Sequence, residues 1–187
     1  MGRPLQDAIL NGLYDQSYPG HELLGPKLLK NNKNDKIWLT LRQELLTCKS
    51  FTWAVAFVTQ DMLVPFKVVM ADLANKNVPG TLITGDYLGF NDPKVFHELK
   101  KIPNLTVKIA QDNGFHAKGY LFKHAGYDTI VIGSANFTRA ALLSNYEWSL
   151  KVSSKENAAL TEQIGKQLSD LEHDSIRLTD AWLRDYE

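Results

Sequence analysis

Four polar side chains in the second half of the chain have the types and spacing to bind and cleave a phosphodiester. His116 and Lys118 stand two residues apart, and Ser134 and Asn136 follow eighteen residues later. In an extended strand, residues two apart share a face, so the imidazole and the ammonium project together. The imidazole can act as a nucleophile or base, while the ammonium, the hydroxyl and the amide can hold phosphate oxygens.

A predicted β-hairpin brings these residues close together. The apolar run at residues 129–132 follows a short polar turn at residues 124–127, a pattern typical of two antiparallel strands. For a turn centred there, the residue numbers of each cross-strand pair add up to about 251, which places His116 opposite about residue 135 and Lys118 opposite about residue 133. The Ser/Asn pair then falls within a few ångströms of the His/Lys pair.

Each of the four residues also has a structural interpretation. A lone histidine in a strand is usually a buried structural residue, but the three other polar groups near His116 favour a functional role for it. Lys118 is hard to explain structurally, because an ammonium among apolar neighbours needs a partner. Ser134 or Asn136 could simply cap the next helix. Both interpretations can hold, since a helix N-terminus is itself an anion site.

Three further residues are candidates for contact with the substrate. Tyr87 and Phe90 lie in a loop at residues 84–90 that leaves the end of a predicted strand, where substrate-contacting groups commonly lie. Their rings either stack on a base or pack beneath the loop. Arg139 follows Asn136 by three residues and either contacts a phosphate or is an ordinary solvated residue.

The remaining acidic and histidine candidates are less distinctive. Glu147 is either a surface carboxylate or a partner that fixes the tautomer of the imidazole and raises its basicity. His97, in a predicted helix, and His124, in the hairpin turn, are expected to be exposed. No metal site is expected, because the histidines lack ligand spacing and Lys118 would repel a cation.

The stretch from residue 115 to residue 150 resembles the signature of the phospholipase D-like superfamily. In that signature a histidine and a lysine two apart precede a Gly-Ser-x-Asn segment, and five residues of this chain fall where the pattern expects them: His116, Lys118, Ser134, Asn136 and Glu147. The chain is most similar to the metal-independent nuclease branch and to the domain that precedes a helicase in some bacterial proteins. The resemblance covers roughly residues 45–153. Phe122 and Lys123 stand where phospholipases carry an aspartate; the nuclease branch also lacks it, so the departure argues against a lipase.

The residues and the resemblance together imply a mechanism without metal or cofactor. His116 attacks the phosphorus in line and forms a phosphohistidine. Lys118, Ser134 and Asn136 stabilise the transition-state charge, and Glu147 orients the histidine. The leaving alkoxide needs a general acid, which in this superfamily is a histidine from a second copy of the motif. This chain has one copy, so we expect a homodimer with a shared active site.

Composition and charge allow this function without requiring it. Residues 154–187 hold 4 Lys/Arg against 8 Asp/Glu, which leaves 17 against 13 for residues 1–153. That mild basic bias is compatible with a polyanionic substrate and equally with ordinary surface. A single cysteine, Cys48, and the lack of a membrane-spanning or signal-peptide stretch predict a cytoplasmic protein that does not enter the membrane.

Hydrophobic periodicity predicts an α/β fold, a mixed β-sheet flanked by helices on both faces. We expect a single domain over residues 1–187, with an irregular N-terminal segment (1–34, apart from a short helix at 5–14) and a C-terminal helical segment (154–187). Expected strands are 51–58, 81–84, 105–109, the hairpin and 146–152. Expected helices are 35–48, 62–76 with Asp61 as cap and Pro65 near its first turn, 93–101, a short one from Asn136 or Thr138 to 144, and a last one carrying Leu160, Ile164, Leu168 and Leu171 on one stripe.

Three functions remain open from the sequence. The favoured one is a metal-independent phosphodiesterase, or nuclease, acting on nucleic acid, with DNA favoured over RNA. The second is a catalytically weak DNA-binding module that targets a helicase or restriction enzyme, with a helicase domain in the same full-length chain. The third, a lipid phosphodiesterase, is disfavoured by the missing aspartate and by the lack of a membrane-directed segment.

Overall fold

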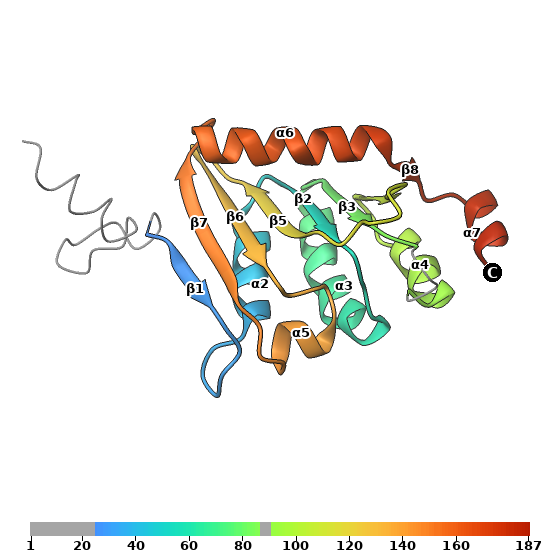
Figure 1. The fold of residues 1–187 in the computed structure, drawn as a ribbon, viewed down its shortest axis with the longest axis horizontal. Coiled ribbons are helices and arrows are strands. Elements are labelled where there is room, and N and C mark those ends of the chain that lie inside the picture. The colour runs from blue at the N-terminus through green and yellow to red at the C-terminus, as the bar shows by residue number, and fades with distance from the viewer. Residues whose placement is uncertain (1–24, 87–90) are drawn as a thin grey trace, which may run out of the picture.

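The computed structural model describes residues 25–86 and 91–187, which build one mixed β-sheet (Figure 1). The strand order across the sheet is β1-β7-β6-β5-β2-β3-β4-β8. β2, β3 and β4 run parallel, and every other neighbouring pair is antiparallel. The strands are β1 (Lys27–Leu29), β2 (Ser50–Val55), β3 (Gly80–Thr84), β4 (Leu105–Ile109), β5 (Lys118–Lys123), β6 (Tyr127–Gly133), β7 (Ser149–Lys155) and β8 (Ile176–Arg177).

Helices cover both faces of the sheet, so the predicted fold class is confirmed (Figure 1). The helix α6 packs on one face and shares a small core with β2, β3, β5 and β6. The other helices contribute to the main core on the opposite face. The helices are α2 (Ile37–Thr47), α3 (Gln60–Asn75), α4 (Pro93–Lys100), α5 (Arg139–Leu143), α6 (Ala159–Asp174) and α7 (Asp180–Tyr186).

An aromatic cluster around Trp53 forms the centre of the main core. The Trp53 ring is fully buried and lies 5.3 Å from the ring of Phe66, 5.1 Å from that of Tyr120 and 5.2 Å from that of Phe137. Such edge and tilted contacts add to the stabilisation from apolar burial. Because these rings come from β2, α3, β5 and the segment after β6, they fix the ends of those elements relative to one another.

The predicted hairpin has the predicted register. Gly119 pairs with Ile132, and Lys123 pairs with Asp128. Lys118 is therefore the first residue of β5 and Gly133 the last of β6, at the same end of the sheet.

Three strand predictions need correction. The 15–34 segment, expected to be irregular, contains β1, which is a strand because it pairs with β7. The strand expected from Tyr146 begins at Ser149. Ser149 pairs with Gly133, the last residue of β6, so the residues before Ser149 have no pairing partner on β6. The 154–187 segment, expected to be helical, also contributes β8 to the opposite edge of the sheet.

Two predictions for α3 also differ from the structure, and of the two residues predicted to start α5 the structure selects Thr138. Thr59, and not Asp61, is the N-cap residue of α3, and Asp61 accepts a hydrogen bond from the Thr59 hydroxyl. Pro65 lies beyond the first turn of α3. Thr138 caps α5 by accepting a hydrogen bond from the Ala141 amide, which leaves Asn136 free of that role. The helix predicted at 5–14 lies outside the described residues.

His124 is buried, in contrast to its predicted exposure. Its ring stacks on Tyr127 with centroids 4.3 Å apart, and its Nε2 lies 3.0 Å from a carboxylate oxygen of Glu44 on α2. The Lys151 ammonium binds the other oxygen of Glu44. A turn histidine normally faces water, but here α2 supplies a buried carboxylate that the local sequence of the turn does not reveal.

This buried ion cluster should make stability depend on pH. Burial alone would raise the pKa of Glu44, but hydrogen bonds from His124 and Lys151 outweigh it and hold the pKa below 4.5. The lowered pKa contributes stability that is present above about pH 4.5 and is lost as the pH falls through the folded-state value. Replacing Lys151 with methionine should lower the free energy of unfolding at neutral pH by roughly 3 kcal/mol, because it leaves a buried charge less compensated.

Urea unfolding at pH 7 and at pH 4 tests this prediction. The exposed Lys155 on the same strand gives the matched control, Lys155→Met, which should be nearly neutral. Equal destabilisation by the two substitutions, or an unchanged pH dependence in Lys151→Met, would contradict the role of the cluster.

Candidate active site

His116 and Lys118 meet at the start of β5. The Lys118 Nζ lies 2.7 Å from the Nδ1 of His116 and donates to the His116 carbonyl at 2.8 Å. His116 is exposed, whereas Lys118 is half-buried. Burial lowers the pKa of the Lys118 ammonium, and the charge of Glu147 opposes that shift. Glu147 therefore helps to keep this lysine positively charged.

Ser134 follows β6 and connects it to the residues before β7. Its amide donates to the Trp148 carbonyl at 2.9 Å, and its Oγ accepts a hydrogen bond from the Trp148 amide at 3.2 Å. The same hydroxyl donates to the carboxylate of Glu147. A Cβ added at Gly133 would lie 2.2 Å from the Trp148 carbonyl oxygen, so this close approach of two backbones requires glycine.

The orientation of Asn136 is set by the end of β2. Its Oδ1 accepts a hydrogen bond from the Phe57 amide at 3.2 Å, which orients the amide group so that its NH₂ is a potential donor to an anion. The ring of Phe57 meets the ring of His116 edge-on, with centroids 5.8 Å apart. Phe57 thus contacts both sides of the candidate site.

Glu147 has a different partner from the expected one. It binds the Ser134 hydroxyl, and among the contacts of the described residues there is none between Glu147 and the His116 ring. The Nδ1 of that ring faces the Lys118 ammonium instead. In this state, Glu147 acts on the site through Ser134 and through the charge on Lys118.

Of the three predicted substrate-contacting residues, the structure describes only Arg139. Arg139 is exposed at the first position of α5, and its backbone amide donates to the Thr59 hydroxyl at 3.2 Å. Tyr87, like Phe90, lies outside the described residues.

A family model described as "Cardiolipin synthase, PLD-like domain" matches residues 41–169, more than half of the chain. The chain belongs to this PLD-like family. No match is found among curated proteins.

Several solved structures share the fold of this chain. NucT from Helicobacter pylori superimposes with a TM-score of 0.62 at 17% sequence identity, over 81% of this chain and 98% of that one. Nuc from Salmonella typhimurium, a phospholipase D family member, gives a TM-score of 0.63 at 16% identity, over 82% of this chain and 97% of that one. Phosphatidylserine synthase from Haemophilus influenzae gives 0.65 at 14% identity, over 85% of this chain and 41% of that one.

Two further residues, outside the motif, contact the residues of the candidate site. Phe57 holds Asn136, and the Tyr120 hydroxyl donates to the carbonyl of Ala135, between the two motif residues, at 2.9 Å. Phe57 follows the end of β2, and the carboxyl ends of parallel strands commonly carry site residues. This rule could have identified Phe57 as a candidate from the sequence, whereas nothing local in the sequence distinguishes Tyr120 from a core aromatic residue.

The described part of the chain has neither a metal-binding cluster nor a membrane-spanning helix. Between residues 25 and 86 and from 91 to 187, no three His, Cys, Asp or Glu side chains are grouped to hold a metal ion. Within the same ranges, none of the helices combines the length and the apolar character needed to cross a membrane.

Proposed function

We propose that this PLD-like domain is a metal-independent phosphodiesterase that cleaves nucleic acid through a phosphohistidine, with one active site shared by two copies. The observation that carries the proposal is the 2.7 Å contact between the Lys118 ammonium and the His116 ring. It places a fixed positive charge directly beside a potential nucleophile, as phosphoryl transfer without a metal ion requires.

The contact between Lys118 and His116 in the free protein must change when substrate binds. An ammonium that donates to Nδ1 leaves the proton of a neutral ring on Nε2. A bound phosphate competes for the ammonium, because its nonbridging oxygens carry negative charge. When Lys118 turns to the phosphate, Nδ1 can carry the ring proton, and Nε2 gains the lone pair that attacks. In that bound state, Glu147 would orient the ring.

The reaction then takes two displacements. His116 Nε2 forms a bond to phosphorus as the bond to the leaving oxygen breaks, and the leaving oxygen takes a proton from a general acid. Water then attacks the phosphohistidine, gives a proton to the same group, and releases the phosphomonoester. Lys118 and the amide of Asn136 hold the nonbridging oxygens in both steps.

The general acid must come from outside this set of residues. The other described histidines are engaged elsewhere, with His97 paired to Glu187, His124 to Glu44 and His173 to Asp174. A second copy would supply its own His116 across a twofold axis.

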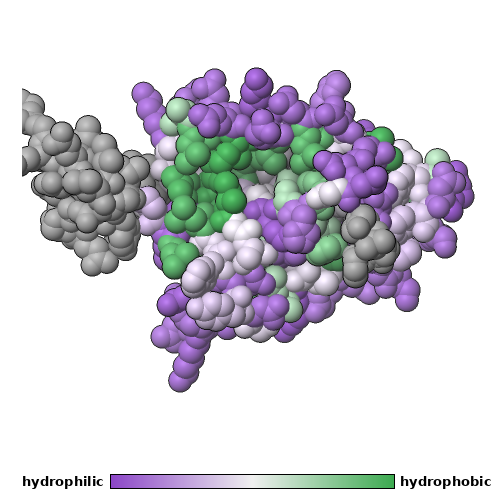
Figure 2. Space-filling model, in the orientation of Figure 1, coloured by the Kyte–Doolittle hydropathy of each residue, from purple (hydrophilic) through white to green (hydrophobic). Residues whose placement is uncertain are grey.

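An exposed apolar patch beside the site supports this assembly. Leu28, Leu150 and Ile132 stand in one row across three adjacent strands and are 57%, 48% and 45% exposed. Trp148, also 57% exposed, extends the row towards Ser134. Figure 2 shows apolar side chains gathered over β6 and β7, beside α6. Apolar patches of this kind commonly mark protein interfaces, and this one ends at the candidate site.

Activity in excess chelator tests the chemistry. Hydrolysis of bis(p-nitrophenyl) phosphate should persist in EDTA, and Asn136→Ala should slow it about a hundredfold to a thousandfold, the usual cost of one oxyanion donor. Asn145→Ala, which removes the side chain of an exposed asparagine nine residues away, is the control and should retain full activity.

Three outcomes would count against the proposal. Strict dependence on added magnesium or manganese would exclude this mechanism. Faster cleavage of phospholipid vesicles than of single- or double-stranded oligonucleotides would move the substrate to lipid. Salt-sensitive DNA binding without hydrolysis would favour the targeting-module function.

A further inference from the structure

A buried asparagine outside the motif joins the ends of two parallel strands. Asn91 is only 2% exposed. Its Nδ2 donates to the carbonyls of Gly85 at 2.6 Å and Ala56 at 3.1 Å, and lies 3.3 Å from the Thr84 hydroxyl. Its Oδ1 accepts a hydrogen bond from the Val58 amide at 2.9 Å. Both ends of the side-chain amide are therefore used, although a buried asparagine is costly unless satisfied.

The segment at residues 56–58, which Asn91 holds, also contacts both halves of the site. Its three successive amides donate in three directions: Ala56 to the carbonyl of Ala117 at 3.1 Å, Phe57 to Asn136 Oδ1 at 3.2 Å, and Val58 to Asn91. Ala117 is the residue between His116 and Lys118. The position of this segment thus relates the His/Lys pair to the amide of Asn136.

Asn91 is itself held from the side opposite to the site. The hydroxyl of Tyr186, on α7, donates to the Asn91 carbonyl at 2.8 Å. The next residue, Asp92, caps α4 by accepting a hydrogen bond from the Lys94 amide at 2.8 Å.

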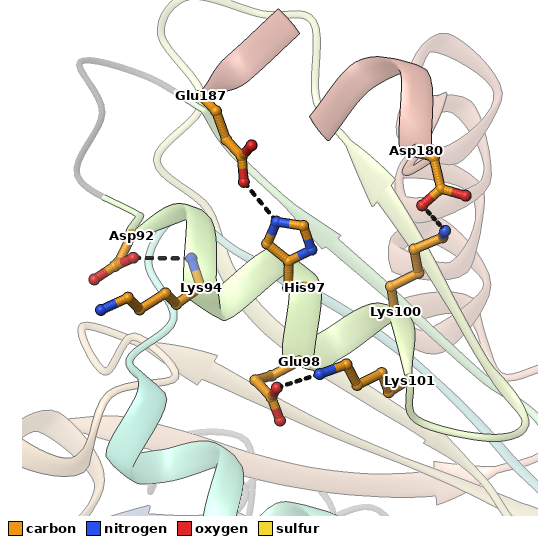
Figure 3. Close-up of polar contacts among 8 residues, drawn as sticks. All are labelled: Asp92, Lys94, His97, Glu98, Lys100, Lys101, Asp180 and Glu187. Carbon is orange, nitrogen blue, oxygen red and sulfur yellow. Dashed lines mark hydrogen bonds and ion pairs between the residues drawn. The ribbon is translucent and has the colours of Figure 1, made fainter. Parts of the chain in front are cut away.

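The helix that starts beside Asn91 is fixed by ion pairs along its length. Figure 3 shows His97 pointing to Glu187, at 2.6 Å, and Lys100 pointing to Asp180, both partners being contributed by the C-terminal part of the chain. Glu98 binds Lys67 on α3. Asn91 is therefore anchored to α4, and α4 to its neighbours.

We propose that Asn91 is a positioning residue of the active site. It fixes residues 56–58 so that the His116 ring and the Asn136 amide face the same phosphate. This inference rests on the proposed function, because it assigns Asn91 to the geometry of that reaction. Asn91 does not touch the substrate, so its loss should affect the rate of the chemical step more than the binding of substrate.

The test compares Asn91→Ala with wild type and with Lys151→Met, which is destabilised at the buried ion cluster instead. At a temperature where all three are folded, Asn91→Ala should lower kcat on the order of a hundredfold and change KM by less than about threefold. Lys151→Met should keep the wild-type kcat. In ¹⁵N NMR spectra, Asn91→Ala should shift the Phe57 amide, the Asn136 side-chain amide and the His116 ring nitrogens together.

A milder variant keeps the test usable if the Asn91→Ala protein does not fold. Thr84→Val removes one hydrogen-bonding partner of Asn91 and the hydrogen bond from the Thr84 hydroxyl to the Ala56 carbonyl, in nearly the same volume. Because it loosens the same junction less than Asn91→Ala does, it should shift the same NMR signals in the same direction by a smaller amount. Unchanged signals of Phe57 and Asn136 in both variants would overturn the inference, as would equal losses of kcat in Asn91→Ala and Lys151→Met.

A titration with inorganic phosphate separates this inference from the proposed function. If wild type binds phosphate at His116 and Asn136 but hydrolyses no phosphodiester, the proposed function fails. Weaker phosphate-induced shifts at those two residues in Asn91→Ala would still support positioning. The readout is the size of the shifts at saturating phosphate and not the affinity, and saturated shifts of equal size in wild type and Asn91→Ala would exclude positioning.

Discussion

Replacing His116 with alanine should reduce phosphodiester hydrolysis on the order of a millionfold, the scale seen when a catalytic nucleophile is removed. The variant loses the imidazole proposed to form the covalent bond to phosphorus, while Lys118 and Asn136 remain to bind the substrate. KM should therefore change far less than kcat. His173→Ala removes an exposed histidine paired with Asp174 on α6 and should be fully active.

The covalent intermediate gives a second, independent measurement. Wild type quenched in alkaline denaturant during turnover should carry a substrate-derived phosphoryl group on the peptide containing His116, detectable by mass spectrometry. The His116→Ala protein should carry none. An adduct on another residue of that variant would show that the nucleophile lies elsewhere.

The fold and the centre of the site could be predicted because both follow from local patterns. Alternation and the turn at 124–127 set the hairpin register, and that register alone brings Lys118 to the level of Gly133. Similarly, the Asp92-Pro93 pair marked the start of α4, since the cap and the proline act within one turn.

Features that depend on distant partners could not be predicted. β1 is a three-residue strand that exists through its pairing with β7, and the burial of His124 depends on Glu44, which lies on another element. Glu147 was expected to bind the imidazole, but the close approach of the chain at Gly133 brings it to Ser134. Asn91 binds the Val58 amide, while the amides of Ala56 and Phe57 in the same segment bind Ala117 and Asn136. Such a network has no signature in sequence spacing.

Placing a charge in the exposed apolar patch should remove the shared active site. Leu150→Asp puts a carboxylate at the centre of the row formed by Leu28, Leu150 and Ile132, which would be desolvated between two copies. Analytical ultracentrifugation should then show a monomer. Activity should fall about a hundredfold to ten-thousandfold, the contribution of a general acid. Val68→Asp, at a valine on α3 that is 65% exposed, introduces the same carboxylate away from the patch and should leave both properties unaltered.

Mixtures of wild type and His116→Ala chains should show that both histidines serve one reaction. If one copy supplies the nucleophile and the other the general acid, a dimer with a single intact histidine is inactive. Random exchange of equal amounts leaves about one quarter of the dimers with two intact copies, so activity should fall to about one quarter of that of the same total amount of wild type. Two independent sites would give about one half. A value near one half, or a wild-type protein that is monomeric and fully active, would contradict the shared site and assign the general acid to a group within one chain.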